Sequence, residues 1–244
     1  MSTHEDFFIG WADRVPTGQR GFLARIGAGF LALMLLLALG LASTMDDAGG
    51  GGADGERTLR GIVTSKPYAL LHVAPDADHP NGHVVILSVV GKFPVVVPPA
   101  LEGKPVEAKG WLFRRGSMDM LQMTALPVPA DTPGAQAPAE NLGTWRLTGE
   151  ICDGQCYVGA MKPGTGLAHR ACANFCLQNG IPPVFVTTAP IHGTSFLLMG
   201  GPGGTNLQAA AYDYVGLRVR LDGTVERRGD ILVFTPDLRT ATLP

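Results

Sequence analysis

The pattern of apolar and polar positions divides the chain into one long apolar run and two regions of short, alternating segments. The run spans 26–44, carries no charged residue, and is about long enough to cross a membrane as a helix. Arginines lie in the polar and aromatic head that precedes it, 1–25, whereas aspartates follow it. This bias predicts an uncleaved, single-pass anchor in the inner (cytoplasmic) membrane, with the N-terminus in the cytoplasm and everything after residue 45 in the periplasm.

A cleaved signal peptide is the alternative to an anchor, since small residues at 40–42 stand where a signal peptidase would cut. The anchor is preferred because the head is long and the apolar run is at the long end for a signal peptide. A glycine-rich tether, 45–56, would then connect the membrane to the rest of the chain.

The two regions after the tether consist of short β-type segments separated by Gly, Pro, Asp and Asn. The first region, 57–127, contains strand-like runs such as 83–90 and 106–113, and none of its segments has a clear helical period. A linker rich in Pro and Ala, 128–142, separates it from the second region, 143–244. The chain is therefore predicted to be mainly β, with two small barrels after the anchor.

The two regions share an internal repeat. Gly61 near the start of the first region matches Gly149 in the second, an offset of 88. Six later positions recur at an offset of 113: Gly103, Val106, Gly110, Arg114, Arg115 and Gly116 match Gly216, Val219, Gly223, Arg227, Arg228 and Gly229. The change of offset predicts about 25 additional residues in the second region, most of which form a cysteine-containing segment.

A strand of the form Gly-x-x-Val-x-x-x-Gly, followed by a hairpin inside a five-strand unit, resembles the oligonucleotide- and oligosaccharide-binding barrel, the OB-fold. The resemblance covers each region, while an SH3-like barrel or a small sandwich stays open. The expected architecture is a transmembrane helix plus two OB-like β-barrels, the second with a cysteine-bearing insertion at 150–183 that contains a short helix. Such a fold does not specify a function.

All four cysteines lie in this insertion, as two Cys-x-x-x-Cys pairs. Cys152 and Cys156 lie at a predicted turn, whereas Cys172 and Cys176 lie in the predicted short helix. Helical spacing places His169 on the same stripe as the second pair. Closing the loop would bring four sulfurs and one imidazole together.

The predicted periplasmic location favours disulfide formation by these thiols over metal binding. Outside the cytoplasm thiols tend to be oxidised, and an even number of cysteines fits two disulfides. The preferred expectation is two cross-pairs between the 152/156 turn and the 172/176 helix, with no cofactor. A zinc ion, a copper ion or an iron–sulfur cluster held by the four cysteines, or by three with His169, is the alternative. Thiol–disulfide exchange is disfavoured because it generally uses Cys-x-x-Cys spacing.

Three histidines form a second candidate cluster. His72, His79 and His83 lie near Asp76 and Asp78, a composition that would suit a metal loop. The turn-forming residues among them favour a solvated turn instead. The matched arginine pairs of the repeat, 114–115 and 227–228, are expected to be charges on hairpin surfaces, with a lipid headgroup or a partner as the alternative contact.

The charge distribution argues against nucleic acid as a partner. The formal net charge is −2, and no run of basic residues is longer than two. No nucleophile-elbow or zinc-protease motif occurs, so we expect a protein that is not an enzyme.

The cysteine segment also resembles a known group of sequences. The motifs Gly-Glu-Ile-x-Asp-x-x-Cys-Tyr, Met-x-Pro-Gly-x-Gly, His-Arg-x-Cys-Ala and Gly-Ile-Pro-Pro resemble a group of membrane-anchored bacterial periplasmic proteins without an established activity. The resemblance covers about a sixth of the chain. It implies placement outside the cytoplasm and leaves the mechanism open.

Two functional hypotheses follow. The first is an accessory or assembly protein of a membrane complex, with respiratory complexes as one candidate, which docks on a membrane-protein partner through a disulfide-stapled lobe. The second is a redox or metal-delivery protein in which the four cysteines and His169 bind a metal ion or cluster.

Overall fold

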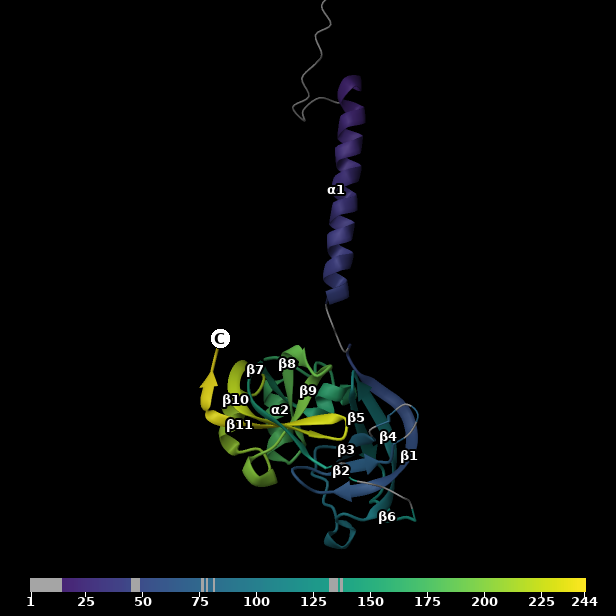
Figure 1. Cartoon of the computed structure of the whole chain (residues 1–244), viewed down its shortest axis with the longest axis vertical. Coiled ribbons are helices and arrows are strands. Elements are labelled where there is room, and N and C mark those ends of the chain that lie inside the picture. The colour runs from purple at the N-terminus through teal and green to yellow at the C-terminus, as the bar shows by residue number, and fades with distance from the viewer. Residues whose placement is uncertain are drawn as a thin grey trace, which may run out of the picture. The chain divides into compact units, whose positions relative to one another are not determined.

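The computed structural model describes residues 15–44, 49–75, 77, 79–80, 82–131, 136 and 138–244. Contacts divide the chain into two units, Met1–Asp47 and Ala48–Pro244, and each is described by itself. Helix α1 belongs to the first unit, and all of the strands belong to the second (Figure 1). The predicted head up to residue 14 and the two aspartates of the histidine cluster, Asp76 and Asp78, lie outside the described residues.

Helix α1 (Thr17–Thr44) has 28 residues and is about 42 Å long at 1.5 Å per residue. It begins before the predicted first residue, 26, and therefore includes Arg20 and Arg25. The helix is long and apolar enough to cross a membrane, a criterion that membrane anchors and signal sequences both meet. The predicted apolar helix is confirmed, whereas its orientation stays a prediction.

Five strands of the first region form a ring closed by pairing of its end strands, and this ring is called the first barrel below. The order is β1-β2-β3-β5-β4, β4 pairs back onto β1, and β3 runs parallel to β5. Side chains of β4 alternate between core and solvent, as the apolar pattern of the sequence predicts. The strands are β1 (Gly52–Thr64), β2 (Leu70–Val73), β3 (His83–Val89), β4 (Pro105–Arg115), β5 (Met118–Met123) and the short β6 (Val128–Pro129), with a 3-10 turn at Pro99–Leu101.

Five strands of the second region close into a barrel of the same order, β7-β8-β9-β11-β10, with β9 parallel to β11. The order and the closure are compatible with an OB-like fold. The strands are β7 (Glu140–Asp153), β8 (Pro183–Ile191), β9 (Thr194–Met199), β10 (Arg218–Arg228) and β11 (Ile231–Thr242), joined by η2 (Cys156–Ala160), α2 (Arg170–Gln178), η3 (Pro202–Gly204) and η4 (Ala209–Tyr214). The mainly β prediction is confirmed.

The repeated glycines stand where strands approach too closely for a side chain. A Cβ at Gly61 would lie 2.3 Å from the His72 carbonyl oxygen, and one at Gly149 would lie 2.3 Å from that of Val186. The glycines of the repeat are therefore explained by packing, because only glycine fits where the backbones of two strands come this close.

Two strands extend into stretches that the sequence predicts as irregular. The first residues of β1, starting at Gly52, pair with β4 although they belong to the predicted tether. Likewise, β7 starts at Glu140, inside the predicted linker, and pairs there with Arg227 of β10. Cross-strand hydrogen bonds recruit these polar residues into strands despite their weak β propensity.

A third core lies between the two barrels. Val85 and Leu87 of β3 face the interior of the first barrel, while Val84 and Ile86 face a cluster that also contains Phe196 and Leu198 of β9. Strand β3 is consequently buried on both faces, which explains its unbroken apolar run. The strands of the two regions lie beside one another in Figure 1.

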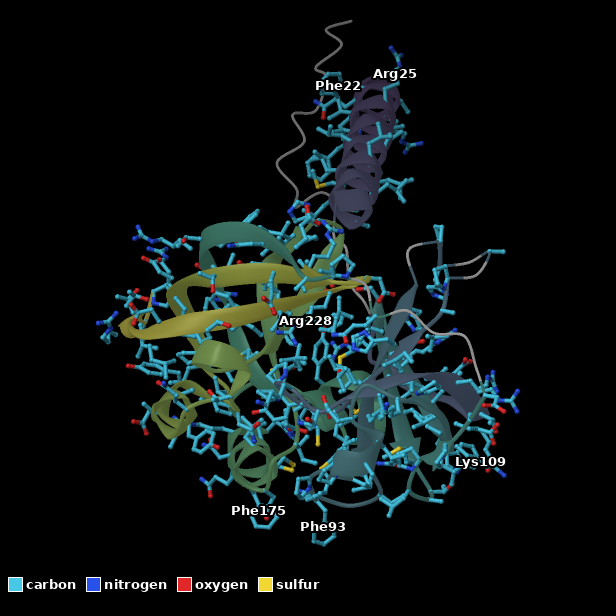
Figure 2. All side chains as sticks on the ribbon, turned by 60° about the horizontal axis from the view of Figure 1, so that its bottom comes forward. Phe22, Arg25, Phe93, Lys109, Phe175 and Arg228 are labelled. Atoms are coloured by element: carbon cyan, nitrogen blue, oxygen red, sulfur yellow. The ribbon has the colours of Figure 1, made fainter. Side chains whose placement is uncertain are left out.

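The second arginine of each repeated pair contributes to this contact. Arg115 Nη1 donates a hydrogen bond to the carbonyl oxygen of Tyr157 at 3.0 Å. Arg228 Nη1 donates to the carbonyl oxygen of Lys66 at 2.8 Å, and Figure 2 shows Arg228 between the two barrels. The interpretation of both pairs as hairpin surface charges is therefore wrong for Arg115 and Arg228, because the hairpins that carry them face the other barrel.

Candidate metal centre

The connection between β7 and β8, 154–182, carries three of the four cysteines. Cys156 starts the π-helical turn η2, while Cys172 and Cys176 lie one helical turn apart on α2. Helix α2 ends as predicted: Gly180 has a φ of 84°, and its N–H donates to the Leu177 carbonyl oxygen. The Ile181 N–H bonds the Cys176 carbonyl oxygen, which completes a Schellman motif.

Asp153 connects the two halves of this lobe. One carboxylate oxygen accepts the Cys156 backbone N–H at 2.8 Å, and the other accepts a hydrogen bond from His169 Nε2 at 2.8 Å. Both Asp153 and His169 are buried. The sequence marks Asp153 only as a turn residue, although an aspartate three positions before a cysteine has the spacing of a local side chain-to-backbone bond.

Buried ligand atoms converge here in two overlapping groups. The ligand atoms of Cys156, His169 and Cys172 lie within 4.8 Å of one another, and so do those of Asp153, Cys156 and Cys176. Cys156 and Cys176 also pack with Ile181 in a small apolar cluster, with Cys172 at its edge. Three thiols and one imidazole from two separate segments could therefore hold a metal ion.

Cys152 lies apart from the other three cysteines. It belongs to the core between the two barrels, and its thiol donates to Glu150 Oε1 at 3.2 Å. Burial, reinforced by Glu150, raises the pKa of the Cys152 thiol well above its ordinary value. Because side chains alternate along a strand, Cys152 and Asp153 of β7 face opposite sides, and Asp153 is the one whose ligand atom joins the cluster of the lobe.

The predicted disulfides are absent from the structure. All four cysteines are among the described residues, all are free thiols, and no two of their sulfurs lie at bonding distance. Two cross-pairs do not form in this arrangement, because Cys152 lies in the core between the barrels and is not part of the cluster of the other three thiols.

Two of the clustered thiols interact directly. The hydrogen bond between Cys156 and Cys176 raises the pKa of Cys156, with burial acting in the same direction, and lowers the pKa of Cys176. Metals bind the thiolate form of cysteine, which the lowered pKa of Cys176 favours.

A lysine of the first barrel approaches the third thiol. Lys92 Nζ lies 2.9 Å from Cys172 Sγ and 5.4 Å from the centre of the Phe175 ring. This hydrogen bond raises the pKa of Lys92, so its ammonium stays charged beside the sulfur. Sequence reading misses Lys92 because it lies far from the cysteines along the chain and in the other barrel.

A cavity of about 210 Å³ opens next to the thiols, between the lobe and the first barrel. Cys156, Cys176 and Met161 line it from the lobe, and Lys92 and Phe113 line it from the first barrel. Phe175 beside it projects outward, as does Phe93 (Figure 2). Two larger cavities, of about 570 and 670 Å³, lie along β10 and β11, away from these thiols. The 210 Å³ cavity gives small solutes access to the sulfurs.

The predicted histidine cluster is rearranged. His72 is buried and bonds Thr64 Oγ1 at 2.9 Å, whereas His79 stacks on His83 with ring centroids 4.2 Å apart. His83 is also buried, and it bonds Asp230 of the other barrel. The preferred interpretation, a solvated turn, is therefore wrong for His72 and His83.

Comparison of the chain with protein-family models, with curated proteins and with solved structures finds no match in any of the three. The role of each residue in the cysteine lobe consequently rests on its own geometry.

Proposed function

We propose that this protein is a membrane-anchored metal-binding protein, in which Cys156, Cys172, Cys176 and His169 hold one thiophilic metal ion. The observation that carries the proposal is that the ligand atoms of Cys156, His169 and Cys172 lie within 4.8 Å of one another, while Cys176 belongs to an overlapping group that shares Cys156, next to a cavity. Thiolate and imidazole ligands suit zinc and copper ions.

The contact between Asp153 and His169 supports this assignment. A carboxylate that accepts this hydrogen bond takes it from a proton on Nε2, and in the neutral imidazole the lone pair is then on Nδ1. Metal-binding histidines commonly donate their second ring nitrogen to a carboxylate in this way, which fixes the tautomer and the ring orientation. Asp153 would therefore position His169 with Nδ1 available to the metal.

The charge distribution around α1 supports the membrane placement, and a metal-bound thiol cluster fits it. Arg20 and Arg25 lie in the N-terminal half of α1, and the positive-inside rule would keep that end in the cytoplasm. The lobe would then face an oxidising compartment, where thiols persist in reduced form when a metal ion occupies them. A metal carrier held at the membrane could serve as the accessory protein of a membrane complex, with a membrane-protein partner and without catalytic activity.

Metal analysis of the full chain, purified in detergent without chelators, tests the proposal. We expect one metal ion per chain in the wild type by native mass spectrometry, and loss of that ion in Cys172→Ser. Cys152→Ala is the matched control, because Cys152 lies in the core between the barrels, and it should retain the metal. A wild-type chain with no stoichiometric metal, or equal metal loss in both variants, would contradict the proposal.

A further inference from the structure

Met161 lies at the mouth of the proposed metal site. It follows η2 directly, lines the 210 Å³ cavity together with Cys156 and Cys176, and is 44% exposed. Its thioether sulfur Sδ lies 3.6 Å from Cys172 Sγ. The sequence places Met161 in the motif Met-x-Pro-Gly-x-Gly without indicating a role for the sulfur.

The sulfur-to-sulfur distance fits a shared ligand. Two sulfur atoms that each bind one metal ion at about 2.3 Å lie about 3.8 Å apart at a tetrahedral angle. The 3.6 Å between Met161 and Cys172 is close to that value, so a metal ion bound by Cys172 would also lie within reach of the thioether.

We propose that Met161 is a further ligand of the site and that the metal ion is monovalent copper; this inference rests on the metal-binding function proposed above. A thioether is a neutral, soft donor that suits Cu(I), whereas zinc sites in proteins are built from thiolate, imidazole and carboxylate. The thioether is therefore the donor at this site that favours copper over zinc.

The charge around the site is consistent with a monovalent ion. Two or more metal-bound thiolates would carry more negative charge than the single positive charge of Cu(I) offsets, so such a cluster would be anionic. The Lys92 ammonium, 2.9 Å from Cys172 Sγ, supplies the compensating charge and an N–H donor to a metal-bound sulfur.

The donors are also ordered by exposure. Met161 is exposed and Cys172 is partly buried, whereas Cys156 and Cys176 are buried deeper along the cavity. An incoming ion would meet the thioether first and the buried thiolates last. The weakest donor thus stands at the mouth, where a partner that exchanges copper would compete for the ion.

Competition titrations of the full chain in detergent test this inference. Wild type and Met161→Leu are titrated anaerobically with Cu(I) against a chromogenic Cu(I) chelator, and separately with Zn(II) against a zinc indicator. We expect Met161→Leu to weaken Cu(I) binding about tenfold and to leave Zn(II) binding unchanged. Met199→Leu is the matched control, because Met199 is fully buried in the core of the second barrel, and it should bind both ions like the wild type.

The outcomes separate the two proposals. Equal Cu(I) affinity in wild type and Met161→Leu, or tighter binding of Zn(II) than of Cu(I) by the wild type, would overturn the copper inference and leave the metal-binding function standing. A wild type that binds neither ion would overturn both.

Discussion

The two barrels have the same strand order, yet the candidate metal centre described above lies in a connection of the second barrel. In the first barrel, the connection between the first two strands is short, 65–69, whereas the corresponding connection of the second barrel, 154–182, contains η2, α2 and the clustered thiols. Neither connection takes part in closing its barrel. This fold therefore accepts an insertion where no strand pairing is interrupted, so functional residues can be added without changing the barrel.

The barrels also contact one another through matching elements. The Arg115 side chain of the first barrel bonds the Tyr157 carbonyl oxygen, which lies in the first connection of the second barrel. Arg228, 113 positions later, bonds the Lys66 carbonyl oxygen in the first connection of the first barrel. Each hairpin therefore holds the equivalent loop of the other barrel, as in a contact with approximate two-fold symmetry.

The turns of the same two hairpins also contact the other barrel, one through hydroxyl groups and the other through an ion pair. Ser117 Oγ lies 2.8 Å from Thr194 Oγ1 at the start of β9. Its counterpart, Asp230, bonds His83 Nδ1 at the start of β3 at 2.5 Å. One half of the contact is thus neutral and the other is ionic, which predicts unequal energetic contributions.

The largest expected effect concerns the shared packing of the two barrels. A Cβ added at Gly110 would lie 2.2 Å from the Gln122 carbonyl oxygen, and one at Gly223 would lie 2.4 Å from that of Thr235. We expect Gly110→Ala and Gly223→Ala each to destabilise the protein by about 3 kcal/mol, since backbone has to move in both. This corresponds to a fall in Tm of roughly 6–12 °C, measured by circular dichroism of the full chain in detergent.

Gly103→Ala serves as the control for this pair. A Cβ at Gly103 meets no atom within 4 Å, so only its φ of 68° opposes alanine, at a cost of about 1 kcal/mol. A tolerated substitution at one of the two matched positions, Gly110 or Gly223, would contradict the equivalence of the barrels.

The next effect concerns the ionic half of the contact and appears as a pH dependence. Burial acts to lower the pKa of His83, but the hydrogen bonds to Asp119 and Asp230 outweigh it and raise the pKa to about 9. The other neighbours are His79, stacked on the ring, and Arg114, which bonds Asp119. A raised histidine pKa contributes stability that is fully present below about pH 6.5 and is lost as the pH rises through about 9.

We therefore expect the wild type to lose about 2 kcal/mol of unfolding free energy between about pH 6.5 and 9. Asp230→Asn removes the charge but keeps an oxygen for the Val84 N–H, which Asp230 accepts at 2.7 Å. This variant should be less stable at pH 6.5 and should show a flatter pH profile. Parallel profiles for the two proteins would mean that the ion pair with Asp230 does not stabilise the contact.

Much of the fold could be predicted because its signals are local. Alternating residues indicate β4 and β10, and the repeated glycines mark the points of close strand approach that both barrels need. The apolar run likewise predicts α1. The contact between the barrels could not be predicted, because Arg115 and Asp230 have partners in the other barrel and neither residue type indicates that partner.

Part of the candidate site was predictable because its signals are also local in the sequence. Cys156, Cys172, Cys176 and His169 are close to one another in the sequence, which indicates that they can meet in one lobe. The error at Cys152 came from treating both members of its pair as turn residues, although β7 continues through 153 and its alternation directs Cys152 into the core between the barrels. Neither the lysine of the first barrel nor the thioether at the mouth has a sequence signal of this kind.

A smaller effect distinguishes the two matched arginines. Besides its hydrogen bond, Arg115 stacks on the Tyr157 ring, with its guanidinium carbon 4.2 Å from the ring centre. Lysine lacks both the fork and the planar stacking surface, so Arg115→Lys should cost about 1.5 kcal/mol and Arg228→Lys about 1 kcal/mol in thermal unfolding. Tyr157 follows Cys156, so Arg115→Lys should also weaken metal binding, while Arg228→Lys, the matched control, should not. Equal metal affinity in both variants would mean that the contact made by Arg115 does not influence the metal site.

The smallest expected effect concerns the neutral half of the contact. Thr194 Oγ1 donates its proton to the Phe196 carbonyl oxygen at 3.1 Å, so Ser117 is the donor in the bond between the two hydroxyls. Ser117→Ala removes that donor but leaves Thr194 with a partner, and it should cost only about 0.5 to 1 kcal/mol in thermal unfolding at any pH between 6.5 and 9. Thr194→Val should cost more, because it also leaves the Phe196 carbonyl oxygen without this donor. If Ser117→Ala instead destabilised the protein as much as Asp230→Asn at pH 6.5, the neutral and ionic halves would stabilise the contact between the barrels equally.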